Sequence, residues 1–545
     1  MTRRHLAGLS LCLAACAAAP MPMPAQPAEV SSQDGGAILA EDAGPIEGGT
    51  IAERDGGPDA AGRWSDLPES PLHVGAPGNA SDLLDARPET GAGPCLVEPE
   101  PGSLIPRNWL RPRFQWKAAP EHNLFELRFI VPNQTRPLVV FTNAPRYTLG
   151  ADLWRALTQH SSGQTVTVSL RGAQVAQGQL VGAPTAPTVA TLEIAPVAAG
   201  GQIVYWTTTR GTALKGFYIG DESVREVLRP SQAGAQCVGC HSSTPDGRHA
   251  AFSASSDSTD GNPSHVAHRT VDGLATAPPY LSDAARTLLR RVPQQLPFFS
   301  AALWTEERKL QLSMLSVNGR WEIAWTNLGA TTQARDAAWG VLARQGDGHQ
   351  AASAHARHDG TGLVYTSSAT VGAGVVLPNG DGDLYTVPFA NGHGGAATAL
   401  RGASEANVSE YYPTYSPDDR LIAFNRAPAG ESSYSNRNAE LFVIAAEGGT
   451  PIRLRANDPP VCVGRRSPGV TNSWPKWSPV VGDNRGKRYY WLTFSSTRNG
   501  DKPQIFVAPV VVDGATATTY PALPLWNQPA DEANHTAAWD FFRIK

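Results

Sequence analysis

The sequence has little of what marks a helical, a membrane-spanning or a nucleic-acid-binding protein. Only 17% of its 545 residues are charged, and the formal net charge is −4 at pH 7. Beyond the first residues, no stretch approaches the roughly 18 consecutive apolar residues of a transmembrane helix. Apolar stripes at helical spacing are scarce. A weakly charged chain without a basic stripe has no electrostatic basis for binding nucleic acid, so we expect no such partner.

The motifs of several common enzyme classes are also missing. The sequence has no Gly-x-Ser-x-Gly elbow, no His-Glu-x-x-His and no P-loop. No nucleophile stands beside an acid or a base in a recognisable pattern. We therefore expect a binding or electron-transfer protein, and an enzyme is the least supported reading.

What is present begins with an export signal. Arg3, Arg4 and His5 form a basic region, and residues 6–15 form an apolar stretch too short to cross a bilayer. The stretch ends in Leu13-Ala14-Ala15-Cys16, which resembles the lipobox of bacterial lipoproteins. The resemblance implies that residues 1–15 are removed and that Cys16 is lipidated. An ordinary signal peptide with a chance cysteine is the alternative.

The lipoprotein resemblance also implies a location. Many such proteins stay in the inner membrane through an Asp after the lipidated cysteine, whereas this chain has Ala17. We therefore expect an outer-membrane lipoprotein of the cell envelope that faces the periplasm or the cell surface. The lipid bilayer is then a partner through acylated Cys16, because several acyl chains together anchor stably.

The segment after the cysteine has the composition of a tether. Residues 17–94 hold 13 acidic residues against three Arg and no Lys, and Ala, Gly and Pro dominate the rest. Such a segment buries too little apolar surface to offset its ordering entropy. We predict a disordered acidic tether over residues 16–94.

In residues 95–196 the pattern changes to short segments of alternating apolar and polar residues, which is typical of β-strands. Examples are residues 113–116, 124–130, 138–142 and 165–170, separated by turns such as Ser161-Ser162-Gly163. This pattern predicts a small immunoglobulin-like β-sandwich. The stretch from Ile105-Pro106 to Trp116, with Trp154 further on, resembles a fibronectin type III module.

An internal repeat dominates residues 197–545. Ser416-Pro417-Asp418-Asp419-Arg420 precedes the apolar residues 421–424, and Thr244-Pro245-Asp246-Gly247-Arg248 and His358-Asp359-Gly360 stand before similar strands. The period of about 60 residues is that of a four-stranded propeller blade with loops. Six anchors can be counted, and the half-copy at residues 534–542 would close the ring against residues 203–206.

These anchors resemble the TolB-type, WD40-like propeller repeat, whose hallmark is Ser-Pro-Asp-Gly before a short apolar strand. The resemblance implies six blades. The predicted fold class is all-β: a tether, a β-sandwich and a six-bladed β-propeller. The Pro-Asp-Gly residues form tight turns in which Asp accepts backbone N–H groups, so we assign them no chemistry.

One motif carries chemistry. Cys237-Val238-Gly239-Cys240-His241 is a C-x-x-C-H, the attachment sequence of haem c. Two thiols three residues apart can bond the haem vinyl groups, and the adjacent His can ligate the iron. The alternatives are an oxidised or redox-active Cys237–Cys240 pair, half of a zinc site, and coincidence.

The sequence specifies the distal haem ligand and the pairing of the other cysteines less clearly than the C-x-x-C-H motif. We name His535 as the first choice for a distal haem ligand, ahead of His349, His355 and Met314. Cys95 and Cys462 remain as a possible disulfide between sandwich and propeller.

Two functional hypotheses follow. The first is a lipid-anchored, extracytoplasmic haem c protein that exchanges electrons with a redox partner docked at the channel mouth. The second is a TolB-like, non-enzymatic interaction scaffold without haem. A monomer is expected under both.

Overall fold

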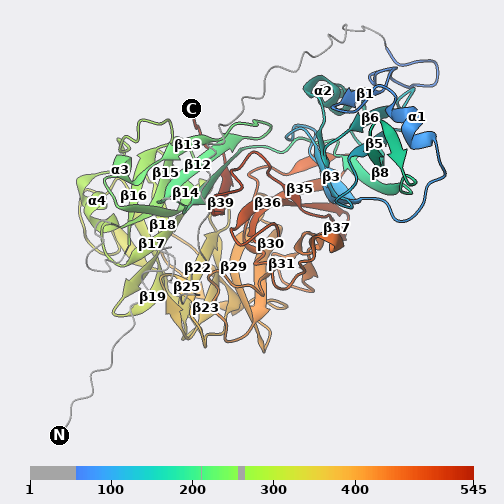
Figure 1. The fold of residues 1–545 in the computed structure, drawn as a ribbon. Helices are drawn as coiled ribbons and strands as arrows, with labels where there is room; N and C mark the ends of the chain where they lie inside the picture. Colours follow the sequence, from blue (N-terminus) through green and yellow to red (C-terminus); the bar gives the residue numbers. More distant parts are fainter. Residues whose placement is uncertain (1–56, 210, 256–263) are drawn as a thin grey trace, which may run out of the picture.

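The computed structural model describes residues 57–209, 211–255 and 264–545. The predicted signal peptide, Cys16 and the first part of the tether lie outside the described residues. The described chain forms an N-terminal β domain up to about residue 194 and a ring of sheets from residue 202 onward (Figure 1).

The N-terminal domain contains two sheets. The larger has the order β1-β6-β5-β8-β10-β3, with β9 on β8, and the smaller has the order β2-β4-β7. Their bounds are β1 (Leu72–Val74), β2 (Cys95–Glu98), β3 (Ser103–Ile105), β4 (Arg113–Lys117), β5 (Leu124–Ile130), β6 (Leu138–Thr142), β7 (Arg146–Thr148), β8 (Thr165–Ala176), β9 (Gln179–Val181) and β10 (Thr188–Ile194). Helix α2 (Ala151–His160) buries Leu153, Trp154 and Leu157. The strands alternate because one face of each covers the apolar core.

The tether prediction is wrong for residues 57–94. Strand β1 pairs in parallel with β6, and helix α1 (Ala80–Asp85) buries Ala80, Leu83 and Leu84. These side chains cluster with Leu124 and Phe141. The segment is ordered because the large sheet supplies the apolar surface that its own composition lacks.

The second part is a β-propeller of antiparallel sheets arranged in a ring (Figure 1). In order along the chain the sheets are β11 (Gln202–Thr207), β12 (Ala213–Tyr218) and β13 (Arg225–Leu228); β14 (Cys237–Ser243), β15 (His249–Ser255) and β16 (His265–Thr270); β17 (Gln294–Phe298), β18 (Leu310–Val317), β19 (Arg320–Asn327) and β20 (Trp339–Val341); β22 (Gln350–Ala356), β23 (Gly362–Ser368), β26 (Asp383–Pro388) and β28 (Thr398–Ala399); β29 (Val408–Tyr415), β30 (Leu421–Pro428), β31 (Glu440–Ala445) and β32 (Ile452–Arg453); and β33 (Ser473–Trp477), β35 (Lys487–Ser496), β36 (Gln504–Asp513) and β37 (Thr516–Thr519).

Shorter elements fill the connections. They are α3 (Pro230–Ala233), α4 (Asp283–Leu289), β21 (Arg344–Gln345), β24 (Val371–Gly372), β25 (Val375–Val376), β27 (Gly395–Ala396), β34 (Gly482–Asn484), β38 (Leu523–Pro524) and three 3-10 turns at Ala301–Leu303, Arg455–Asn457 and Val461–Val463. Among the described residues no helix is long and apolar enough to cross a membrane.

The predicted ring closure is confirmed. The last strand, β39 (Asn534–Asp540), pairs antiparallel with β11 at the start of the propeller, and Figure 1 shows its red ribbon beside the green strands. The predicted role of the turn residues is also confirmed: Asp246 Oδ1 accepts the backbone N–H of Arg248 at 3.1 Å, and Asp418 Oδ1 accepts that of Arg420 at 3.3 Å.

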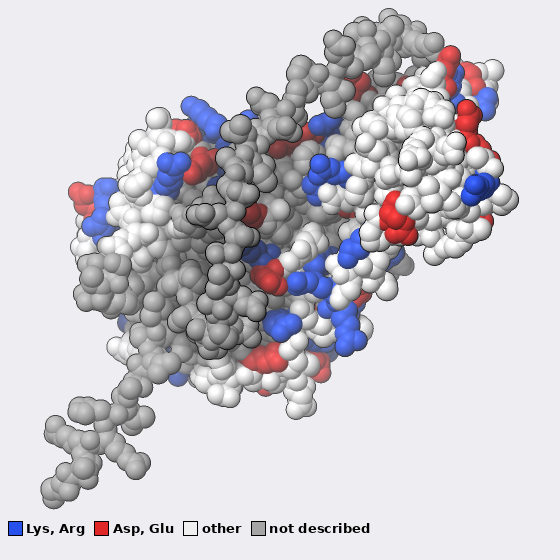
Figure 2. Space-filling model, viewed as in Figure 1, with Lys and Arg blue, Asp and Glu red and all other residues white. Residues whose placement is uncertain are grey.

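The N-terminal domain is fastened to the propeller. A disulfide joins Cys95 to Cys462. Arg111 forms an ion pair with Glu222, and its carbonyl accepts the indole N–H of Trp526 at 3.0 Å. Apolar residues of both parts share one core. On the face seen in Figure 2, basic and acidic residues are interspersed and neither sign forms a broad patch.

Candidate functional site: the central channel pocket

The innermost strands of consecutive sheets share an irregularity where they line the channel. In each of β14, β17, β22, β29, β33 and β39 the pairing register shifts by one residue. Such a bulge bends the strand and redirects its side chains. In five of these strands a residue inside the bulge has a positive φ, which non-glycine residues rarely adopt. These residues are Leu296, Ser353, Tyr412, Trp474 and Thr536.

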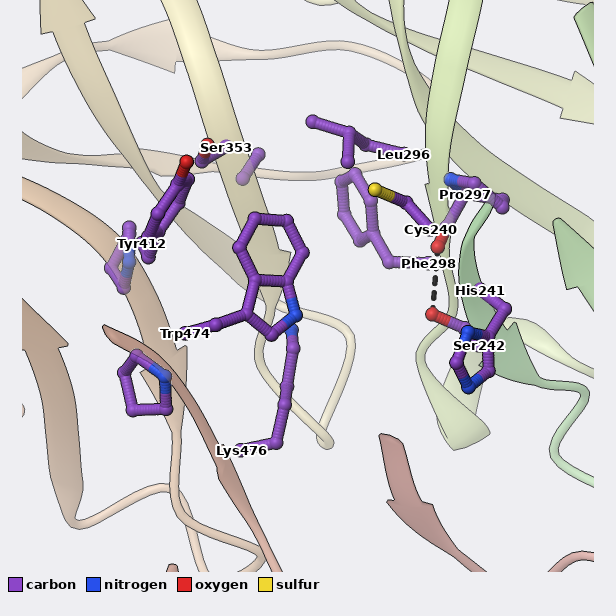
Figure 3. A pocket seen from close by; sticks show the side chains of 13 residues that line it. Cys240, His241, Ser242, Leu296, Pro297, Phe298, Ser353, Tyr412, Trp474 and Lys476 are labelled. Atoms are coloured by element: carbon purple, nitrogen blue, oxygen red, sulfur yellow. Dashed lines mark hydrogen bonds between the residues drawn. The ribbon is translucent and has the colours of Figure 1, made fainter. Parts of the chain in front are cut away.

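The bulges meet around a small pocket of about 40 Å³. The walls are apolar or aromatic for the most part, with a thiol, an amine, an imidazole and hydroxyl groups among them. The lining residues are Cys240, His241, Ser242, Leu296, Pro297, Phe298, Ser353, Ala354, Tyr412, Pro413, Trp474, Pro475 and Lys476. Figure 3 shows the Trp474 indole in the middle of the lining side chains, between Tyr412 and Cys240, with the Lys476 side chain running toward it.

The two cysteines of the C-x-x-C-H motif have different environments. Cys240 is a free thiol in the pocket wall, and burial raises its pKa to about 11. Cys237 is buried, and because Cys240 is a free thiol the two are not bonded to each other. The thiol of Cys240 is therefore protonated at neutral pH and is a poor nucleophile there.

The imidazole of His241 is turned away from Trp474 (Figure 3). Its Nε2 lies 3.0 Å from the carbonyl oxygen of Val204, and its buried Nδ1 has no hydrogen-bond partner among the residues that the structure describes. Burial lowers its pKa to about 4, so the ring is neutral at pH 7. This arrangement packs β14 against β11, the first strand of the neighbouring sheet.

The observed strand does not fit a C-x-x-C-H haem site. Cys237 pairs with Ser255 and His241 with Phe252. Because paired residues share a face and successive residues of a strand alternate, Cys237 and His241 project to opposite faces of the sheet. A haem c held by this motif needs both sulfur atoms and the imidazole at one macrocycle. Of the three, Cys240 and His241 line the pocket, whereas Cys237 does not.

Lys476 is the charged side chain of the pocket. Burial lowers its pKa to about 8, so it is mostly charged at pH 7. Within the described chain it forms neither an ion pair nor a side-chain hydrogen bond. Asp540 of β39 interacts with it electrostatically but lies beyond ion-pair distance, and burial raises the Asp540 pKa to about 6.

His535 lies beside a second, adjoining cavity of about 460 Å³. Tyr412 and Trp474 line both cavities, and Arg437 and Arg465 lie in the wall of the second. The His535 ring packs against Trp206 at 4.5 Å, and its Nε2 is 3.4 Å from the Thr208 hydroxyl. By strand register the counterpart of His241 in β39 is Ala538, and His535 lies three residues before it.

The other candidate ligands are spread over the propeller. His355 lies in β22, and its Nδ1 accepts the backbone N–H of Tyr415 at 3.3 Å. His349 is exposed, and Met314 is buried in the apolar core. Among the described residues no three His, Cys, Asp or Glu side chains are grouped as metal ligands are.

Sequence reasoning missed Tyr412, Trp474 and Lys476, although a signal was present. Leu296-Pro297-Phe298, Tyr412-Pro413-Thr414 and Trp474-Pro475-Lys476 occupy one position of the repeat. Proline is tolerated in a bulge because the bulge interrupts the hydrogen-bond ladder. An apolar or aromatic residue before proline therefore marks the channel-lining position, where Cys240 replaces the proline in β14.

No protein-family model matches the chain, and no curated protein matches it. Solved structures match it weakly. The hydrazine synthase of Kuenenia stuttgartiensis is 14% identical over 52% of this chain and 70% of its own, with a TM-score of 0.28. A puromycin-hydrolyzing peptidase of Mycobacterium tuberculosis is 12% identical over 79% of this chain, with a TM-score of 0.31.

The β-propeller domain of the trilobed protease from Pyrococcus furiosus is 9% identical over 68% of this chain and 97% of its own, with a TM-score of 0.27. The match spans 56% of the mycobacterial peptidase, which is less than two thirds of that protein. These likenesses concern strand arrangement only.

Proposed function

We propose that this chain is a lipid-anchored, extracytoplasmic binding protein of the cell envelope that takes a ligand at the mouth of its propeller channel. The observation that carries this proposal is the pocket itself, where consecutive inner strands bring aromatic walls and one amine together. Concave, mostly apolar sites with a few polar groups are the usual form of ligand sites. The pocket has no paired nucleophile and base, which favours binding over catalysis.

The finer architecture belongs to the same proposal. We count six blades, one for each propeller sheet, with β39 completing the sheet of β11. The repeat then corresponds to the TolB-type propeller that the sequence resembles. The two N-terminal sheets with their common core correspond to an immunoglobulin-like or fibronectin type III-like sandwich that is extended by residues 57–94.

The location is supported by cysteine chemistry. Disulfides such as Cys95–Cys462 persist in oxidising compartments and are rare in the cytosol. Together with the basic and apolar leader before Cys16, this supports export, lipidation at Cys16 and attachment to the outer membrane.

Site-specific photo-crosslinking in cells tests the binding proposal. A photoreactive residue at Ser435, which lines the second cavity, should yield a defined crosslinked species, and one at exposed Lys487 should not. Labelling with radioactive palmitate should require Cys16. Equal crosslinking from both positions, or none from Ser435, would argue against a ligand at the channel mouth.

A second candidate is retained because of the C-x-x-C-H motif. In this alternative the chain carries covalent haem c at Cys237 and Cys240, with His241 as proximal ligand, and transfers electrons to a docked partner. Arg437 and Arg465 are suited to bind carboxylates such as haem propionates. The haem would require β14 to change conformation, because the present strand separates the motif side chains.

A visible spectrum decides between the two candidates. The full chain is expressed with its export signal in a host that matures cytochromes c. Covalent haem gives a reduced-minus-oxidised α-band that survives acid-acetone extraction and is lost in Cys240→Ser. A colourless protein from the same host, beside a coloured control cytochrome, excludes the haem candidate.

A further inference from the structure

The polar groups that face the channel pocket are suited to an anion. None of the residues that line this pocket is Asp or Glu, whereas Lys476 supplies a cationic amine. A charge held among apolar walls is costly unless a partner neutralises it. Because Lys476 has no ion pair in the described chain, the structure leaves this neutralisation to a ligand.

The neutral polar groups of the pocket agree with this charge. Ser242 and Ser353 already donate their hydroxyl hydrogens to the carbonyl oxygens of Pro297 and Gly374. The hydroxyl of Tyr412 accepts a long hydrogen bond from Ser433, at 3.4 Å, so its own hydrogen is available. Within the described residues the indole N–H of Trp474 has no acceptor. Two neutral donors thus accompany the amine.

The shape of the pocket selects the body of the ligand. The Trp474 indole stands in the middle of the lining side chains, beside Lys476 (Figure 3). Leu296 and Phe298 line the same space, and three prolines complete it. A flat apolar group can stack on the indole face while a charged group on its edge reaches the amine.

We propose that the channel pocket and the adjoining cavity of about 460 Å³ together bind a small carboxylate with a flat, apolar body. Its carboxylate pairs with Lys476, and its body stacks on Trp474, which lines both spaces. This inference rests on the proposed binding function and names the ligand class of that same site. A carboxylate accepts from both an ammonium and an indole N–H, which suits the convergent donors.

The proposal has a pH dependence with a defined sign. Lys476 is protonated below its pKa of about 8, so affinity for the anion is present at pH 7 and falls as the pH rises through 8. The titratable groups around it are Cys240 and His241 on β14, His355 on β22, Tyr412 on β29 and Asp540 on β39. Burial keeps the thiol and phenol protonated and the imidazoles neutral between pH 7 and 9, so Lys476 alone changes charge there.

Calorimetric titration of the full exported chain tests the inference with two probes, 2-naphthoate and the uncharged 2-naphthalenemethanol. We expect naphthoate to bind at least tenfold more tightly at pH 7. Lys476→Met should remove this preference, whereas Lys476→Arg should keep it and also keep it at pH 9. The matched control is Lys487→Met, an exposed lysine paired with Asp513, which should behave as the wild type.

Each contrary result has a distinct meaning. Equal binding of the two probes overturns the anion inference and leaves the pocket as a binding site. If the preference for naphthoate survives Lys476→Met, the carboxylate of the ligand binds somewhere other than Lys476, and the anion inference is also overturned. If neither probe binds, the inference is wrong, and the crosslinking from Ser435 separately decides the proposed function.

Discussion

Arg498 lies behind the wall of the channel pocket and supports it through side-chain hydrogen bonds. Its guanidinium is buried and donates to Asn472 Oδ1 at 2.8 Å. The carbonyl of Asn472 accepts from Asn425, whose Oδ1 accepts the backbone N–H of Trp474 at 3.0 Å. This chain of contacts fixes the bulge that carries Trp474, where φ is 63°. The strained backbone persists because its surroundings determine it.

Arg498→Lys should therefore destabilise the protein and loosen the pocket. The ammonium group of lysine cannot reproduce the planar, forked guanidinium of Arg498, so either Asn472 Oδ1 or the Ala456 carbonyl loses its hydrogen-bond donor. Leaving a buried acceptor unsatisfied costs about 1–3 kcal/mol. Urea unfolding followed by fluorescence measures the loss, with exposed Arg466→Lys as the control. Equal midpoints for the two variants would show that the guanidinium is not needed.

At this scale the sequence revealed less of the site than of the fold. Cys240 was found because its motif is contiguous, and the structure places it in the pocket. Lys476 and Trp474 are distant from it in the chain, and only the ring of inner strands brings them together. The opposite directions of Cys237 and His241 depend on a bulge of one residue, which no spacing rule reveals.

Strand β39 is the element on which the ring depends. It carries the C-terminal end of the chain back to β11, and its Trp539 is buried in the core shared by the propeller and the N-terminal domain. The Trp539 indole donates to the Gly200 carbonyl at 2.7 Å. The sequence predicted this closure because the half-copy of the repeat leaves a sheet incomplete. The sequence did not predict β1 or α1, because these elements become ordered only by packing on the large sheet, whose strands are distant in the chain.

Trp539→Ala should weaken the closure. Truncating a buried tryptophan costs about 3–5 kcal/mol and here removes a hydrogen bond as well. Phe541, two residues away, is 50% exposed and gives a matched control in Phe541→Ala, which should change stability by less than about 0.5 kcal/mol. Limited proteolysis should cut Trp539→Ala faster near the C-terminus. Similar cleavage of both variants would mean that the ring stays closed without this side chain.

The whole molecule is held together by polar, apolar and covalent contacts between its two parts. Arg455 donates to the Pro101 carbonyl at 3.2 Å and Lys117 to the Cys462 carbonyl at 3.1 Å, next to the Cys95–Cys462 disulfide. The sequence could suggest this pair only by elimination among six cysteines. The structure adds that the bond connects β2 of the N-terminal domain to a loop of the propeller.

Removal of this disulfide should lower stability without separating the parts. The bond spans 367 residues, so it strongly restricts the unfolded chain, and losing it should cost about 2–5 kcal/mol. The native parts should stay together, because Arg111–Glu222 and the shared core remain. We expect Cys95→Ser/Cys462→Ser to unfold at a lower urea concentration than Cys240→Ser, which removes a thiol without breaking a disulfide. Small-angle X-ray scattering should give the same radius of gyration for the two variants. Equal urea midpoints, together with two alkylatable thiols at Cys95 and Cys462 in the exported wild type, would show that the bond does not form in the mature protein and would remove its support for an oxidising compartment.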